Sequence, residues 1–286
     1  MTAPAGPRRA LIINADDYGL TPSVSAGIRQ AHLAGLLTST TTMMNMPGVA
    51  EELERARAEC PALGLGVHLV LTKGQPLLPP EAVPSLMGLS SGAGLPGLSA
   101  LLEGVERLVA AEVEAEWRAQ VEAFVRVTGH PPTHLDSHHH TSFVSPALLG
   151  AMLDLARAFG CAIRNPVTSL DTAQRHLGLK PQQYDHLRQY IVPMLAAAAD
   201  VPHPDHFDVR FFGARASEAL LREVLVGLPA GVTELMCHPG LPDAALAEVS
   251  SYHRHRAQEL EALTAPGLRE AAAAAGVKLA HFGVLG

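Results

Sequence analysis

Short apolar segments alternate with helical patterns along the whole chain, and this alternation restricts the fold more than any other feature. Segments expected to be strands lie at residues 10–15, 40–45, 65–71, 133–137, 161–164, 207–212, 232–237 and 277–282. Helical patterns lie between them, at residues 21–35, 47–56, 100–127, 146–160, 182–199, 217–228, 254–263 and 268–275. A repeated strand–helix order is typical of a parallel sheet with helices outside it.

This order predicts an α/β fold, and the leading architecture is a distorted or incomplete (β/α) barrel with parallel strands and outer helices. An open doubly wound sheet is the alternative, although no GxGxxG motif follows the first strand. The chain has 286 residues, and α/β barrels of about 250 residues form one domain. We therefore expect residues 1–286 to form a single catalytic domain.

Residues 72–99 are rich in Gly, Pro and Ser and show no periodicity. A gap of this length inside a compact domain is usually functional, as a lid or a binding loop. We therefore expect an active-site loop or lid here.

Charge and composition exclude several classes of partner. The formal net charge is −7 and no basic run is present, which disfavours nucleic acid and anionic membranes. The first residues lack the apolar run of about 7–15 residues that a secretion signal requires. The three cysteines, Cys60, Cys161 and Cys237, form no CxxC pair, which favours a reducing, cytoplasmic location. Aromatic residues make up 4%, which favours a small substrate over a polymer because polymer clefts use aromatic platforms.

Polar side chains gather where four predicted strands end. Asp16 and Asp17 follow the first strand, and His68 lies on the third. The run Asp-Ser-His-His-His at residues 136–140 follows the fourth strand, and His238 follows a later one. Because an α/β barrel carries its active site at the carboxyl ends of its strands, we expect these side chains to converge on one site.

Each cluster also has an explanation that involves no function. Two aspartates before Tyr-Gly are common in turns, since Asp tolerates unusual backbone angles. A histidine on an apolar strand is usually a core residue, three consecutive histidines can be a surface run, and His-Pro-Gly can simply end a strand. The shared position at strand ends favours a site over these separate explanations.

The spacing within residues 136–140 strengthens the prediction. Along an extended chain, Asp136, His138 and His140 point to one face and His139 points to the other. A carboxylate beside imidazoles suits a metal site or the groups that orient its ligands.

Five other histidines are set aside as structural. His253 and His255 lie on an expected solvated helix face, His203 and His206 lie in a proline-rich loop, and His134 follows two prolines that favour an extended chain.

Four motifs in this order, NADDYG, VHLVLTKGQPL, THLDSHHH and MCHPG, resemble those of the YdjC-like carbohydrate deacetylases. That family includes chitooligosaccharide deacetylases and relatives linked to hopanoid synthesis, and the THLDSHHH form is closer to the chitooligosaccharide branch. The resemblance extends from Arg9 to at least Gly240. It implies a distorted barrel, often a homodimer, with a divalent ion held by one aspartate and two histidines.

Carried over by motif, the resemblance implies Asp17, His68 and His138 as metal ligands. It also implies Asp16 as the catalytic base and His238 as the acid. Three further residues are candidates for supporting the ligands or the substrate: Asp136, His140 and Arg164. The family's usual histidine after the triple histidine is replaced by Thr-Ser-Phe-Val-Ser-Pro at residues 141–146, which bears on substrate preference rather than on the ligands.

These residues fit hydrolysis of an amide, which is slow because water is a weak nucleophile and an amine is a poor leaving group. Three protein ligands leave positions open for water and the acetyl oxygen. The resemblance implies Mg²⁺, whereas two imidazoles and a carboxylate suit Zn²⁺ or a similar transition ion. The expected function is removal of an N-acetyl group, with acetate release, from a small amino sugar or chitooligosaccharide.

Two alternatives remain open. A metal-dependent sugar isomerase on a similar barrel would need more carboxylates around the ion. A module that binds sugar or metal without turnover would need neither the base nor the acid.

Overall fold

One parallel sheet organises the chain, of which the computed structural model describes residues 9–167, 174 and 180–285. Its strands are β1 (Arg9–Tyr18), β2 (Ser39–Thr42), β3 (Gly64–Leu69), β4 (His134–Ser137), β5 (Ala162–Ile163), β6 (His206–Asp208), β7 (Gly231–Cys237) and β8 (Lys278–Leu279). The order is β5-β4-β3-β2-β1-β7-β6, with β8 beside β1. All of these pairs are parallel.

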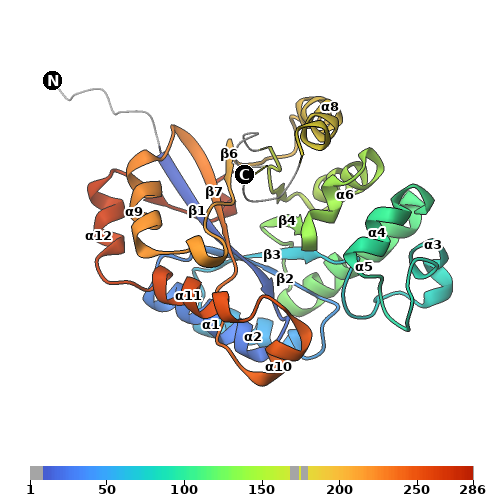
Figure 1. Cartoon of the computed structure of the whole chain (residues 1–286), viewed down its shortest axis with the longest axis horizontal. Coiled ribbons are helices and arrows are strands. Elements are labelled where there is room, and N and C mark those ends of the chain that lie inside the picture. The colour runs from blue at the N-terminus through green and yellow to red at the C-terminus, as the bar shows by residue number, and fades with distance from the viewer. Residues whose placement is uncertain (1–8, 168–173, 175–179, 286) are drawn as a thin grey trace.

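The sheet curls into a half-barrel surrounded by helices, as Figure 1 shows. No strand ladder joins β5 to β6 within the described residues, so the barrel is incomplete. Single hydrogen bonds do link the two edges: the Ile163 amide donates to the Pro202 carbonyl at 2.9 Å, and the Asn165 side chain donates to the Pro204 carbonyl at 2.9 Å. The predicted α/β class and incomplete barrel are confirmed, and the doubly wound alternative is not needed.

The helices are α1 (Pro22–Ala34), α2 (Val49–Glu59), α3 (Pro84–Met87), α4 (Leu98–Gly104), α5 (Ala110–Thr128), α6 (Pro146–Phe159), α8 (Pro181–Ala197), α9 (Glu218–Gly227), α10 (Ala244–Val249), α11 (Arg254–Leu263) and α12 (Leu268–Ala274). Polar caps fix where several begin. The Thr21 hydroxyl accepts from the Val24 amide, as the Thr-Pro signal predicts, and Ser145 caps α6 in the same way. Such caps pair amides that the first helical turn leaves without partners.

The core explains why the site lies where it does. β1 lies between β2 and β7 and is buried along almost its whole length. A central strand that is covered on both faces can carry polar side chains only at its end or in a satisfied network. Asn14, Asp16 and Asp17 occupy that carboxyl end, and all three are buried.

Some predicted elements differ in extent. β6 is shorter than the expected strand at 207–212, and α10 was not predicted. Residues 72–99 contain the short helix α3 and the start of α4, and they are held against α5: the Leu77 and Leu78 amides each donate to the Glu116 carboxylate at 2.9 Å. Within the described residues, every helix is too short or too polar to span a membrane.

Candidate active site

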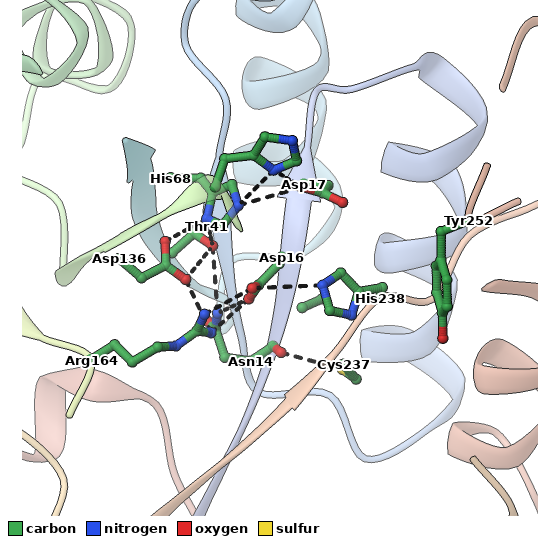
Figure 2. A network of polar contacts seen from close by, with 12 residues as sticks. Asn14, Asp16, Asp17, Thr41, His68, Asp136, Arg164, Cys237, His238 and Tyr252 are labelled. Atoms are coloured by element: carbon green, nitrogen blue, oxygen red, sulfur yellow. Dashed lines mark hydrogen bonds and ion pairs between the residues drawn. The ribbon is translucent and has the colours of Figure 1, made fainter. Parts of the chain in front are cut away.

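A carboxylate and two imidazoles meet at the carboxyl end of the sheet. Oδ1 of Asp17 lies 3.0 Å from Nδ1 of His138 and 3.4 Å from Nε2 of His68. The two imidazole nitrogens are 3.3 Å apart. All three side chains are buried, and Figure 2 shows Asp17 and His68 pointing toward each other from β1 and β3.

Backbone conformations that most residues avoid aim the side chains around this cluster. Asp17 has φ = 69°, and His139 and His140 have φ = 57° and 55°. The expectation that residues 136–140 stay extended, with His139 on the opposite face, is wrong. The chain turns after Ser137, so His139 and His140 both line the cavity at the site. Left-handed residues of this kind are costly and concentrate at functional sites.

Asp136 holds His68 from the neighbouring strand. The two residues lie opposite each other in the β3–β4 pair, and Nδ1 of His68 donates to Oδ1 of Asp136 at 2.6 Å. The Thr41 hydroxyl donates to the other oxygen of Asp136 at 3.1 Å. Burial opposes the imidazolium, but the Asp136 carboxylate outweighs it and raises the pKa of His68 to about 10. Nε2 of His68 is thus left to face Asp17, as in a metal-bound histidine supported by a carboxylate.

Asp16 lies beside this cluster and is held by Arg164 (Figure 2). Arg164 donates to both Asp16 oxygens, at 2.8 and 2.6 Å, and its Nε donates to Glu234 at 2.8 Å. Nη2 of Arg164 also lies 3.0 Å from Asp136. Burial alone would raise the pKa of Asp16, but Arg164 holds it well below its usual value. Asp16 is therefore an ionised carboxylate at neutral pH. Its neighbour Glu234 differs, because burial raises the pKa of Glu234 to about 7.

His238 faces Asp16 from the end of β7. Its Nε2 lies 3.8 Å from Oδ2 of Asp16. Its Nδ1 is buried and has no hydrogen-bond partner among the described residues. Burial lowers the pKa of His238 to about 4, so the imidazole is neutral at pH 7.

An aromatic wall, made of Phe212 and Tyr252, stands beside His238. The two rings stack with centroids 4.4 Å apart and planes 10° from parallel, and Phe212 meets the His238 ring edge-on at 5.4 Å. One Glu259 oxygen accepts from the Tyr252 hydroxyl and the other from the His238 amide. Glu259 thus fixes the wall and His238 to each other.

Arg256 pairs with the second oxygen of Asp17, at 2.5 Å. Its Nε donates to the Tyr252 carbonyl at 2.9 Å. The expected solvated helix face at residues 252–256 is therefore wrong at Arg256, which is only 2% exposed. The buried Asp17 carboxylate accounts for this burial, since a buried charge requires a partner.

The donor atoms of Asp17, His68 and His138 suit a divalent ion. They lie within 4.8 Å of one another. Among the described residues, Oδ1 of Asp17 has no hydrogen-bond donor in suitable geometry. Nδ1 of His138 and Nε2 of His68 both face this oxygen, at 3.0 and 3.4 Å. A cation would satisfy all three atoms at once. A second group, Asp16, His68 and Asp136, has similar spacing, but its atoms are already paired with Arg164, Thr41 and one another.

These side chains open onto one cavity of about 360 Å³, which we call the catalytic cavity. Its lining includes Asp16, Asp17, His68, His138, His139, His140, His238, Phe212, Tyr252, Arg256 and Leu98. Every candidate from the sequence except Asp136 and Arg164 lines it, and those two lie behind it in the buried network.

His134 lies outside the cluster, as expected from its sequence context. Its ring is buried, contacts Oδ1 of Asn14 at 3.1 Å and stacks on Phe282. Sequence reasoning missed Glu234, Arg256 and the aromatic wall. A charged residue inside the apolar strand VTELMC was a usable signal for Glu234, whereas the wall joins residues 40 positions apart and left no local pattern.

Fold and site together define a half-barrel α/β protein with a buried carboxylate–imidazole cluster at the carboxyl ends of its strands. The chain matches the YdjC-like protein family over residues 10–274. It belongs to the YdjC-like family.

Its relatives cover almost the whole chain. It is 37% identical to a carbohydrate deacetylase of Enterococcus faecalis over 96% of this chain and 97% of that one. It is 34% identical to a chitooligosaccharide deacetylase of Serratia marcescens, over 96% and 98% of the two chains. A crystal structure from Enterococcus faecalis V583, named for cellobiose-phosphate cleavage, matches with a TM-score of 0.83 at 34% identity and covers 97% of this chain and 99% of that chain.

Proposed function

We propose that this protein is a metal-dependent carbohydrate deacetylase, which hydrolyses the N-acetyl group of a small amino sugar or chitooligosaccharide and releases acetate. One observation carries the proposal: a three-ligand cluster, Asp17, His68 and His138, shares a cavity with a separate carboxylate and a separate imidazole. The names of the relatives, carbohydrate and chitooligosaccharide deacetylase, support the substrate class.

The ligands would hold one divalent ion. Such an ion, when bound, lowers the pKa of water and stabilises charge on the acyl oxygen. Two imidazoles and one carboxylate favour Zn²⁺ or a similar transition ion over Mg²⁺, which prefers oxygen ligands. Asp136 orients His68 for this role, and Arg256 leaves one oxygen of Asp17 for the ion.

Asp16 and His238 would move the protons. Arg164 keeps Asp16 ionised, so this carboxylate accepts the proton of the attacking water. His238 is neutral before the reaction because of its burial, so it has to gain a proton before it gives one to the departing nitrogen. The 3.8 Å separation of His238 Nε2 from Asp16 supports a transfer between them, since such contacts often tighten when substrate binds.

The aromatic wall suits the sugar. Phe212 is 38% exposed and lines the catalytic cavity, and aromatic faces stack on flat apolar surfaces. A sugar placed there would bring its amide nitrogen to His238. Leu98 reaches the cavity from the end of the 72–99 segment, which supports a role for this segment in covering the substrate.

Several finer expectations stay proposals: a single catalytic domain over residues 1–286, a cytoplasmic location and a homodimer. Buried, free Cys60, Cys161 and Cys237 are compatible with a reducing compartment. We also propose no nucleic-acid or membrane partner.

The direct test is a panel of N-acetylated mono- and disaccharides, assayed for free amine after reconstitution with zinc, magnesium, manganese or cobalt. Release of amine and acetate in equal amounts supports the proposal. Aldose–ketose conversion without acetate would instead identify an isomerase. Sugar binding without turnover under every metal would identify a non-catalytic module.

A further inference from the structure

A second cavity, of about 270 Å³, adjoins the catalytic cavity and is almost entirely apolar. We call it the apolar cavity. Its described lining includes Leu102 of α4, Phe143 and Val144 after β4, Leu187 and Ile191 of α8, and Phe207 of β6. Arg188 also lines it, and its guanidinium lies over the Tyr184 ring, 5.6 Å from the centroid. Apolar cavities of about 150 Å³ hold a benzene molecule, so this space admits a chain of several carbons.

The two cavities are neighbours and share three lining residues, Leu98, His139 and His140. The His140 ring lies between them, 6.1 Å from the centroid of Phe207 and 6.4 Å from that of Phe143. A ligand bound in the catalytic cavity therefore needs only to pass these imidazoles to reach the apolar cavity.

The positions of His138–His140 and His238 in the sheet indicate which end of the substrate faces the apolar cavity. His138, His139 and His140 follow β4, whereas His238 follows β7, on the other side of β1. The proposed acid His238 and the aromatic wall take the amide nitrogen and its sugar. The acyl carbon's remaining substituent then extends away from His238, toward His139 and His140.

We propose that the apolar cavity binds the acyl chain of the substrate, so that the protein hydrolyses N-acyl amino sugars with chains longer than acetyl. This rests on the proposed function and extends its substrate class. In the reaction water forms the new C–O bond, the C–N bond breaks, and the nitrogen gains the proton, giving the fatty acid and the free amino sugar.

The test compares N-acetyl-, N-butanoyl- and N-hexanoyl-glucosamine, with hexyl N-acetylglucosaminide as the control that carries an alkyl chain on the anomeric oxygen instead of on the acyl group. Each buried methylene is worth about fourfold in binding. Each step from acetyl to butanoyl and from butanoyl to hexanoyl adds two methylenes, so we expect kcat/KM to rise by up to about fifteenfold at each step, with no gain for the hexyl glycoside. Leu187→Trp, which fills the cavity, should remove the gain for hexanoyl while leaving N-acetyl turnover within about twofold. Leu102→Trp is the second filling variant, because Leu102 is 46% exposed and tolerates bulk. Val226→Trp, at a position 74% exposed on α9, is the matched control.

Calorimetry with the Asp16→Asn variant measures binding of the same compounds without turnover. Affinity that rises with acyl length, and falls again in Leu187→Trp or Leu102→Trp, supports binding of the acyl chain in the apolar cavity. If the wild type then hydrolyses none of the compounds, the proposed function and the hydrolysis of longer acyl chains are contradicted, while the binding site stands. Hydrolysis of N-acetyl sugars with no gain from longer acyl chains overturns the proposal and leaves the function intact. A gain for the hexyl glycoside instead also overturns it, because the cavity would then take the group on the sugar's anomeric carbon.

Discussion

Arg164 donates hydrogen bonds to both carboxylate oxygens of Asp16, at 2.8 and 2.6 Å. The same guanidinium binds Glu234 and approaches Asp136. The buried guanidinium of Arg164 thus contacts three carboxylates. It connects Asp16, the proposed base, to Asp136, which orients His68. Changes at Arg164 should alter proton transfer without removing the proposed metal ligands.

Replacing the base should separate catalysis from metal binding. Asp16→Asn should retain the metal and lose about 10²–10⁴ in kcat, the usual contribution of a positioned acid or base. His68→Ala should lose both the bound metal and the activity, because this change removes a proposed metal ligand. Metal content after dialysis and acetate release measure the two effects. Asp154→Asn, at an exposed aspartate of α6, is the control. Wild-type turnover in Asp16→Asn would show that another group is the base.

Arg164→Lys should shift the acid limb of the pH profile. Loss of the two-pronged contact removes part of what lowers the pKa of Asp16, so the limb of kcat/KM should move to higher pH by up to about 1–3 units. Lysine keeps a positive charge among the buried carboxylates and so limits the loss of stability. Steady-state rates from pH 4 to 9 give the answer. An unmoved limb with a reduced kcat would mean that Arg164 supports the fold rather than the base.

Acid should destabilise the metal-free protein through its buried neutral histidines. Burial lowers the pKa of His238 to about 4 and that of His134 well below its usual value. Below about pH 6.5 the unfolded chain gains protons that the folded chain does not, so the free energy of unfolding should fall as the pH falls. Each such group contributes up to about 1.4 kcal/mol per pH unit. Urea denaturation from pH 7 to 4.5 in chelator measures this.

The His134→Gln variant isolates one histidine in that experiment. Its loss of stability on acidification should be smaller than that of the wild type, whereas the exposed His130→Gln variant should match the wild type. Glu234 acts in the opposite direction, since its pKa is raised to about 7 and its contribution is lost as the pH rises. Parallel curves for His134→Gln and wild type would contradict the assigned burial effect.

Phe212→Ala should weaken sugar binding more than chemistry. The ring is exposed in the catalytic cavity and held by Tyr252, and a stacking contact is worth about 0.5–1.5 kcal/mol. We expect KM to rise about two- to tenfold with a small change in kcat, and Phe212→Tyr to restore it. A large loss of kcat with unchanged KM would mean that Phe212 positions His238 instead.

The fold was predictable because apolar periodicity and caps act locally. The Thr21-Pro22 start and the buried strand at residues 10–15 carry their own signals, and the strand ends then bring Asp17, His68 and His138 together. Arg256 and Phe212 were not predictable in this way. Their roles come from contacts made only after α11 and the segment after β6 pack over the sheet, and a charged, histidine-rich run resembles a solvated helix until a buried carboxylate is known to face it.

The left-handed pair His139 and His140 has a consequence for how this site can change. An extended chain would direct only alternate residues of the triple histidine to one side. Because the chain turns after Ser137, three successive imidazoles line the catalytic cavity, and two of them, His139 and His140, also line the apolar cavity. The first imidazole, His138, is a proposed metal ligand, whereas His139 and His140 line both the catalytic cavity and the apolar cavity. Variation downstream, at residues 141–146, can therefore reshape what the apolar cavity accepts while the proposed metal ligands stay the same.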